Sequence, residues 1–98
     1  MSKFNELING DQPVLVDFHA TWCAPCHTMA PILEALKTEI GSKARIIKVD
    51  IDKNQAAARQ YNVRGVPTFI LFKNGKQLWR QSGAIPKQML EQAINQAL

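Results

Sequence analysis

The sequence has only two cysteines among its 98 residues, and these lie close together as Cys23 and Cys26. Two cysteines are too few for a disulfide-rich scaffold. No apolar run approaches the ~20 residues of a membrane span. The 12 basic and 8 acidic residues give a net charge of +4, but the basic residues are scattered from Lys3 to Lys87. Without a basic run or stripe, the charge does not indicate a nucleic-acid surface.

The composition is that of an ordinary globular protein, with 46% apolar and 20% charged residues. Residues 1–98 are therefore expected to form one small domain. The first six residues lack the apolar region of a signal peptide. We expect a cytoplasmic protein, and in a reducing cytoplasm a CxxC pair is more often catalytic or metal-binding than structural.

Hydrophobic patterning predicts alternating helices and strands. The near-continuous apolar run 14–18 is typical of a strand covered on both faces. Asn74-Gly75 indicates a two-residue hairpin turn. The expected elements are a helix over 2–10, a strand over 14–18, a helix between 21 and 41, a strand over 44–51, a helix over 54–62, strands over 68–72 and 76–81, and a helix starting at Pro86. This order predicts an α/β fold with a mixed sheet and helices on both faces.

The two cysteines can form a redox dithiol, half of a zinc site or a small structural loop. Cys23 is expected at the N-terminus of a helix, where free N–H groups and the helix dipole stabilise a thiolate. Cys26, one turn inside the helix, should be more buried and less readily ionised. This asymmetry suits a two-step exchange, in which Cys23 attacks a substrate disulfide and Cys26 then attacks the mixed disulfide.

The other two interpretations are weaker. A zinc site needs about four ligands, and His19 and His27 are the remaining nitrogen donors, at spacings that fit no usual pattern. A structural disulfide that closes so short a loop constrains the unfolded chain little. Asp17 adds a further sign of function, because it is the one charge within a buried apolar run. Burial should raise the pKa of this carboxyl, and such residues are enriched at functional sites.

The motifs around the two cysteines also resemble those of a known family. Trp22-Cys23-Ala24-Pro25-Cys26 follows Val16-Asp17-Phe18, and Arg64-Gly65-Val66-Pro67-Thr68 lies about forty residues later. These motifs in this order resemble the thioredoxin family. Pro31, the stretch 48–52 and the step Gly83-Ala84 also fall where that family has matching residues. The resemblance covers nearly the whole chain from Pro13 onward.

The resemblance implies a thioredoxin fold. Only 16 residues precede Asp17, too few for both the first helix of the family and the strand that normally precedes it. We therefore expect a mixed central sheet of four strands flanked by four helices, with 44–50 at an exposed edge. An exposed edge can pair with another chain, but Arg45 and Lys48 oppose this, and we expect a monomer.

The resemblance also implies a function, that of a general protein disulfide reductase cycling Cys23 and Cys26. Such a protein binds no cofactor or metal and receives electrons from NADPH through a thioredoxin reductase, its expected partner besides disulfide-containing proteins. Asp17 is implied as the buried acid that helps move the Cys26 proton, and Lys48 as a charge that tunes it. The residues implied to bind substrate, with Pro67 as a cis proline, are Trp22, Ala24, Pro25, Val66, Pro67, Gly83 and Ala84.

Two other functions fit the same fold. One is a disulfide oxidant or isomerase, and the other is a redox-independent module that binds one partner. The chain also departs from the family pattern at three positions. Ala24 replaces the usual glycine, His19 stands where a large aromatic residue is common, and His27 replaces a basic residue that often follows the second cysteine.

Overall fold

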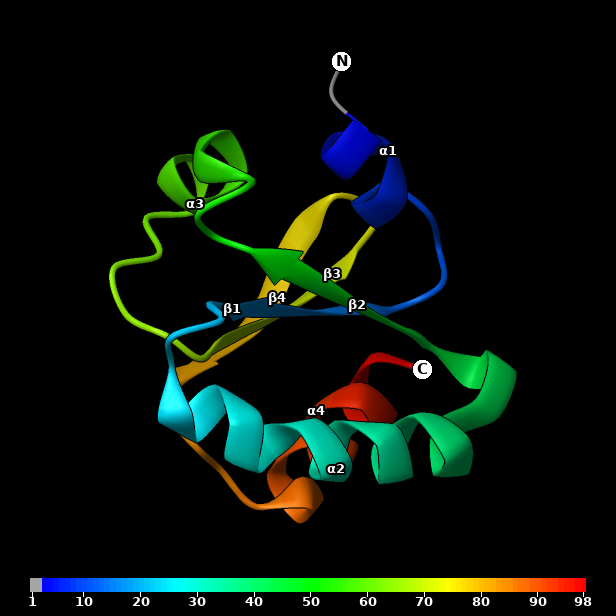
Figure 1. Cartoon of the computed structure of the whole chain (residues 1–98). Coiled ribbons are helices and arrows are strands. Elements are labelled where there is room, and N and C mark those ends of the chain that lie inside the picture. The colour runs from blue at the N-terminus through cyan, green and yellow to red at the C-terminus, as the bar shows by residue number, and fades with distance from the viewer. Residues whose placement is uncertain (1–2) are drawn as a thin grey trace.

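A mixed sheet with helices on both faces forms the fold, as seen in a computed structural model that describes residues 3–98 (Figure 1). The elements are α1 (Lys3–Ile8), β1 (Val14–His19), α2 (Ala24–Ile40), the 3₁₀ helix η1 (Gly41–Lys43), β2 (Arg45–Asp50), α3 (Gln55–Gln60), β3 (Thr68–Lys73), β4 (Lys76–Ser82) and α4 (Lys87–Ala97). Ser2, where the first helix was predicted to begin, lies outside the described residues.

The strands lie in the order β2-β1-β3-β4. β1 pairs in parallel with β2 and antiparallel with β3, and β4 returns antiparallel to β3. The return is made at Asn74 and Gly75, whose φ angles of 54° and 76° suit a two-residue hairpin turn. Within the described residues, the predicted sheet of four strands with four α-helices is confirmed, and β2 forms one edge of the sheet, as expected.

Two apolar layers enclose the sheet. Because side chains alternate along a strand, Leu15 faces the layer under α2 and α4, whereas Val14 and Val16 face the layer under α1 and α3 (Figure 1). The first layer contains Met29, Leu33, Leu36, Phe69, Leu71, Leu90 and Ile94. The second contains Ile8, Phe18, Val49, Ala57, Ile70 and Phe72. A strand buried on both faces thus leads directly to the cysteines.

Some predicted element ends are wrong by one or two residues. Pro86 is not the first residue of α4 but its N-cap, with extended backbone at φ −65° and ψ 148°. The residue before a helix is typically extended, and proline at this position suits such a conformation. Likewise, β2 and α3 are shorter at both ends than the predicted 44–51 and 54–62. These differences do not move the cysteines relative to the sheet.

Candidate active site

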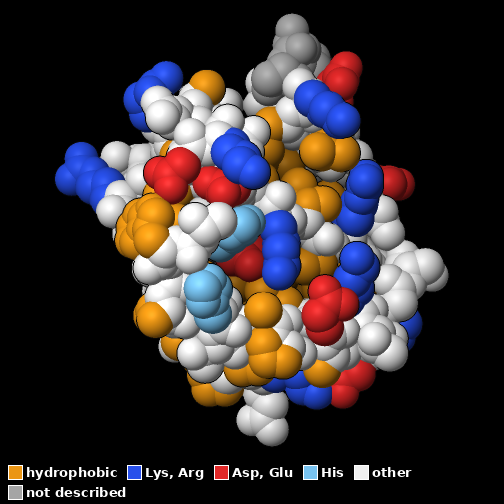
Figure 2. Space-filling model, in the orientation of Figure 1, with side chains coloured by type: hydrophobic (Ala, Val, Ile, Leu, Met, Phe, Trp, Pro, Cys, Tyr) orange, Lys and Arg blue, Asp and Glu red, His pale blue; other side chains and the backbone are white. Residues whose placement is uncertain are grey.

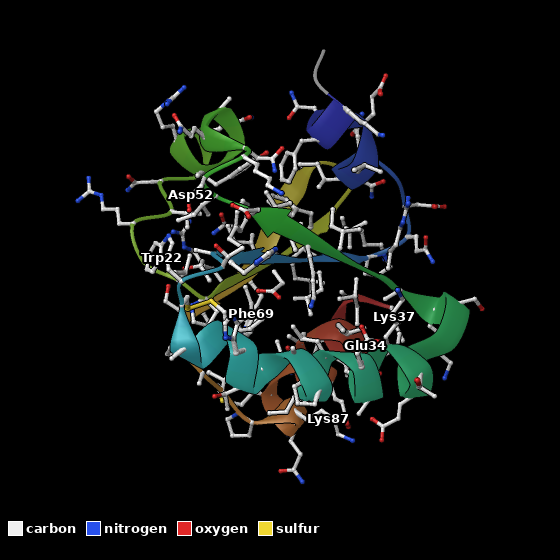
Figure 3. All side chains as sticks on the ribbon, viewed as in Figure 1. Trp22, Glu34, Lys37, Asp52, Phe69 and Lys87 are labelled. Atoms are coloured by element: carbon white, nitrogen blue, oxygen red, sulfur yellow. A yellow bond between two sulfur atoms is a disulfide. The ribbon has the colours of Figure 1, made fainter. Side chains whose placement is uncertain are left out.

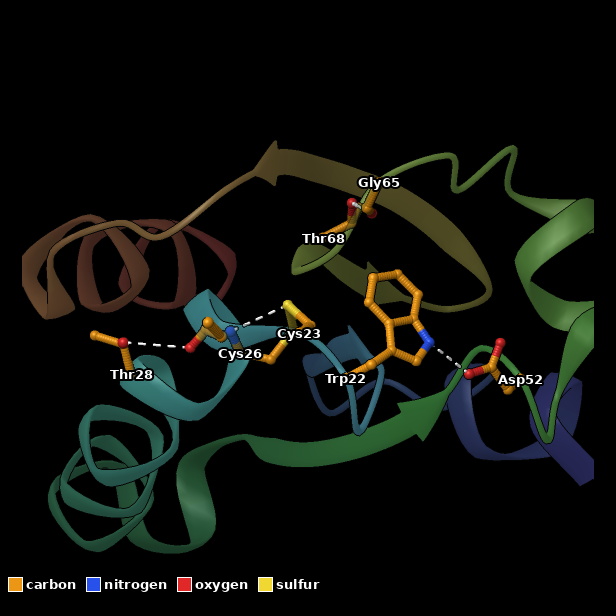
Figure 4. Close-up of a disulfide and its surroundings, with 8 residues drawn as sticks. Trp22, Cys23, Cys26, Thr28, Asp52, Gly65 and Thr68 are labelled. Atoms are coloured by element: carbon orange, nitrogen blue, oxygen red, sulfur yellow. Dashed lines mark hydrogen bonds between the residues drawn. A yellow bond between two sulfur atoms is a disulfide. The ribbon is translucent and has the colours of Figure 1, made fainter.

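The cysteine pair lies where β1 gives way to α2. The chain turns over residues 20–23, and the amide of Cys23 donates to the carbonyl of Ala20 at 3.3 Å. Cys23 is the N-cap of α2, with extended backbone at φ −97° and ψ 109°, and Pro25 lies in the first helical turn. The two cysteines form a disulfide with a Cα–Cα distance of 5.3 Å (Figure 4). The predicted position of Cys23 at a helix N-terminus is therefore what the structure shows.

The helix N-terminus acts directly on the Cys23 sulfur. The backbone amide of Cys26 donates to Cys23 Sγ at 3.2 Å, as a capping side chain would accept it (Figure 4). α2 has 17 residues, so its dipole adds to this local hydrogen bond. Once the disulfide is reduced, the same amide and dipole favour negative charge on Cys23, and a thiolate there is the attacking species in disulfide exchange.

The burial of the two cysteines differs from the prediction. Cys23 is 4% exposed and Cys26 is 8% exposed, so Cys26 is not the more buried residue of the oxidised pair. Ile51 and Val66 pack against the small cluster formed by Ala20 and the two cysteines, so both cysteines are covered. Access to the disulfide is therefore narrow.

Asp17 is buried on β1, on the face of the sheet that α2 covers. It is 4% exposed, and within residues 3–98 its Oδ1 atom has no hydrogen-bond partner. Burial raises the pKa of this carboxyl, while the nearby His19 and Lys48 partly oppose the increase. A carboxyl whose pKa lies above the usual range can exchange a proton closer to neutral pH. The expected burial of Asp17 is observed.

Lys48 stands directly across from Asp17 in the parallel pairing of β1 with β2. It is exposed, and it makes no salt bridge with Asp17 in the described part of the chain. His19, two residues along β1, lies opposite Asp50. Figure 2 shows the two histidine side chains on one face, with a Lys or Arg side chain beside one of them. Positive charge therefore borders the buried carboxyl.

The segment 63–67 approaches the cysteines from the other side. The Val66–Pro67 peptide bond is cis. Val66 is half-buried and packs against the cysteine cluster. The carbonyl of Pro67 accepts a hydrogen bond from the amide of Gly83 at 2.8 Å, which joins the end of β4 to this segment. Val66 therefore contacts the cysteine cluster, and Pro67, the next residue, is joined to Gly83, which precedes the exposed Ala84.

Among residues 3–98, the most exposed large apolar side chain is Trp22, at 68%. Its indole Nε1 donates to the carboxylate of Asp52 at 2.9 Å (Figures 3 and 4). Ala24 and Pro25 are also exposed, so they extend the surface beside Trp22. The sequence did not identify the role of Asp52. The one available signal was that β1 and β2 are parallel, which brings the chain after both strands to the same edge of the sheet.

The titratable side chains of the described residues do not form a metal site. Among residues 3–98, no three His, Cys, Asp or Glu side chains are placed to hold a metal ion together. His27 is exposed in the first turn of α2, and its backbone amide donates a hydrogen bond to the carbonyl of Cys23 at 3.3 Å. The helices of this part of the chain are also too short or too polar to span a membrane.

Comparisons with known proteins agree with this geometry. A family model described as Thioredoxin matches residues 1–96. The chain is 46% identical to the thioredoxin of Haemophilus influenzae over 90 residues, which cover 92% of this chain and 84% of that protein. It is also 46% identical to chloroplastic thioredoxin Y of Oryza sativa over 98 residues, 99% of this chain but only 58% of the plant protein.

Solved structures give the same result. The thioredoxin of Fasciola hepatica superposes with a TM-score of 0.89 at 40% identity, over 97% of this chain and 91% of that one. Mitochondrial thioredoxin 3 of Saccharomyces cerevisiae, in its oxidised form, superposes with a TM-score of 0.87 at 34% identity, over 96% of this chain and 87% of that one. The sequence comparisons and the structural comparisons therefore agree, since both match proteins named thioredoxin.

Proposed function

Because this chain belongs to the thioredoxin family of thiol–disulfide oxidoreductases, which act as protein disulfide reductases, we propose that it reduces protein disulfides through a mixed disulfide on Cys23. The observation that carries the proposal is the hydrogen bond from the Cys26 amide to Cys23 Sγ at 3.2 Å, at the start of α2. It supports Cys23 as the thiolate and therefore as the attacking sulfur.

The reaction has two exchanges. The Cys23 thiolate attacks one sulfur of the substrate disulfide, a new S–S bond forms, and the other substrate sulfur leaves as a thiolate. Cys26 then attacks Cys23, which releases the second substrate sulfur and closes the Cys23–Cys26 disulfide. Two electrons pass from the dithiol to the substrate, and the substrate thiolates take up protons according to their own pKa values.

Asp17 is proposed as the group that receives the Cys26 proton before the second exchange. The support is its burial on the face covered by α2, together with a pKa raised by that burial. A base is most effective when its pKa lies near the working pH. Lys48, opposite Asp17 on β2, partly opposes this rise in the pKa of the carboxyl, as His19 does.

The substrate surface is proposed to surround the disulfide on two sides. Trp22, Ala24 and Pro25 lie on one side, and Val66, Pro67, Gly83 and Ala84 lie on the other. Val66 is the residue whose backbone would pair with an extended substrate chain, because it packs against the cysteine cluster and remains half-exposed. Recognition through the backbone imposes little side-chain selection, which suits a reductase with many protein substrates.

The cycle requires an external source of electrons. Thioredoxins use no cofactor of their own; for this chain the proposed source is NADPH, through a thioredoxin reductase. A dithiol that must be reduced again in every cycle needs a reducing compartment, so we place the protein in the cytoplasm. Residues 1–98 would act as one domain and as a monomer.

The test is reduction of insulin, whose chains are joined by disulfides, with dithiothreitol as the electron source. The chain should accelerate insulin reduction strongly, and Cys23→Ser should abolish the acceleration. Cys26→Ser should also stop turnover, because the mixed disulfide is no longer resolved. If wild-type protein gave no more than the rate of dithiothreitol alone, the proposed reductase function would be wrong.

A further inference from the structure

The segment that carries Val66 connects α3 to β3, and its second half is tied to the sheet. Thr68 Oγ1 donates to the carbonyl of Gly65 at 2.7 Å, and its hydroxyl lies 3.0 Å from that of Ser82 on β4. The amide of Gly83 donates to Pro67 at 2.8 Å. The end of the segment next to Pro67 is thus fixed by β3 and β4.

The first half of this segment is held by Arg80, a residue to which the proposed function assigns no role. Arg80 on β4 donates through Nη1 to the carbonyl of Tyr61 and through Nη2 to the carbonyl of Asn62, the latter at 3.0 Å. Tyr61 is the C-cap of α3, where the last backbone acceptors of a helix have no partner within the helix, and Asn62 follows it. Asn62 has a φ of 54°, so the chain changes direction here, between the helix and Val66.

The placement of Arg80 explains why an arginine is needed. Arg80 lies opposite Ile70 in the antiparallel pair of β3 and β4, so its side chain leaves the sheet on the face covered by α3. The guanidinium is planar and presents several N–H donors at fixed angles, so it can bind two neighbouring carbonyls at once, which a lysine cannot do equally well. Arg80 is half-buried, and it forms no salt bridge among residues 3–98. Its donors serve the end of α3.

We propose that Arg80 is a positioning residue for protein substrates: by binding the carbonyls of Tyr61 and Asn62, it fixes the first half of the segment, and together with the ties at Gly65 and Pro67 it sets the Val66 backbone. This inference rests on the proposed reductase function. It predicts a division between substrates. A protein disulfide that pairs with the Val66 backbone needs the segment in place, whereas a small aromatic disulfide needs only the Cys23 sulfur.

The experiment compares Arg80→Met with Arg59→Met as a matched control. Arg59 is an exposed arginine on α3 whose side chain makes no hydrogen bond or salt bridge in the described structure. For each protein, KM and kcat are measured with insulin, with dithiothreitol as the electron source. The rate with 5,5′-dithiobis(2-nitrobenzoate) is measured in a single reaction of the pre-reduced protein, without dithiothreitol. Arg80→Met should raise KM for insulin about three- to tenfold, a change of up to about 1.4 kcal/mol. Its kcat with insulin and its rate with the small disulfide should stay within about twofold of wild type, since the cysteines are untouched. Its redox potential should be unchanged.

Arg80→Lys and amide hydrogen exchange guard against a variant that simply unfolds. Arg80→Lys should keep the fold and still raise KM for insulin, and exchange at residues 63–66 should be faster than in wild type. The proposal is overturned if the folded Arg80 variants keep the wild-type KM, or if they lose equal activity on insulin and on the small disulfide. A wild-type protein that reduced neither substrate would instead contradict the proposed function.

Discussion

Asp17 lies directly across from Lys48 in the parallel pairing of β1 and β2, but the aspartate is 4% exposed whereas the lysine is solvent-exposed. The Lys48 charge, which with His19 opposes the rise in the pKa of Asp17, is therefore screened by water. One carboxylate oxygen of Asp17 has no hydrogen bond in the described residues. Burial prevails over the attraction, so the pKa of Asp17 is raised.

The raised pKa makes stability depend on pH. The folded chain binds the Asp17 proton more tightly than the unfolded chain, so the stabilising contribution of Asp17 is complete below its unfolded pKa and is lost as the pH rises through the folded pKa. Asp17→Asn removes this loss. The free energy of unfolding of Asp17→Asn minus that of wild type should therefore be about 1–3 kcal/mol greater at pH 8 than at pH 3.

Urea unfolding of both proteins at the two pH values measures this difference. Packing effects of the substitution are the same at both pH values and cancel in the comparison. A stability difference between Asp17→Asn and wild type that did not change from pH 3 to pH 8 would contradict the assignment of Asp17 as a buried, ionisable group.

The same carboxyl should control the second exchange. With Asp17→Asn no base receives the Cys26 proton, and we expect release of reduced substrate to slow, by up to about a hundredfold. In wild type this rate should fall as the pH drops through the pKa of Asp17, and Lys48→Gln should move the fall to higher pH because a positive charge is lost. Stopped-flow kinetics across pH measures both effects, and a wild-type pH profile in Asp17→Asn would remove Asp17 from the mechanism.

The order of the two exchanges can be read from trapped adducts. Cys26→Ser should accumulate a mixed disulfide between Cys23 and a substrate peptide, since no thiol remains to resolve it. Cys23→Ser should accumulate little adduct. The Cys26 sulfur does not receive the backbone-amide hydrogen bond that supports a thiolate at Cys23. Mass spectrometry after incubation with an oxidised peptide distinguishes the variants. A larger adduct on Cys23→Ser would reverse the assigned roles.

The Trp22–Asp52 hydrogen bond should fix the indole beside the disulfide without adding much stability. Asp52→Ala should speed hydrogen exchange at the Trp22 indole N–H severalfold, whereas Asp52→Asn keeps an acceptor and should retain most of the protection. Since the bond is exposed, the free energy of unfolding should change by less than about 1 kcal/mol. NMR of the indole N–H measures the exchange, and equal rates in the alanine variant and wild type would mean that Asp52 does not hold the ring.

Local patterns in the sequence predicted the elements that position the site. The apolar run 14–18 gave a strand buried on both faces, Asn74-Gly75 gave the hairpin, and the position of Cys23 before a helical pattern gave its place as an N-cap. Each of these signals lies within a few neighbouring residues, which is why it could be read from the sequence. The ends of α3 and α4 were less accurate, because capping geometry and not periodicity decides them.

Contacts between distant residues could not be predicted in the same way. Asp52 bonds a ring 30 residues away, and Arg80 bonds the end of α3 from a strand 18 and 19 residues further along the chain. Neither aspartate nor arginine leaves a periodic signature at such separations. The predicted order of burial of Cys23 and Cys26 was also wrong. Their cluster is covered by Ile51 and Val66, which come from other parts of the chain.

The most direct test of the reductase function is the equilibrium of the Cys23–Cys26 pair in graded glutathione buffers, followed by tryptophan fluorescence. The account predicts a midpoint potential at least about 30 mV below that of the glutathione pair, equivalent to about tenfold in the equilibrium constant. A midpoint above glutathione would contradict it and would make the protein a disulfide oxidant or isomerase. A pair that never titrated would leave only a structural or metal-binding role for the two cysteines.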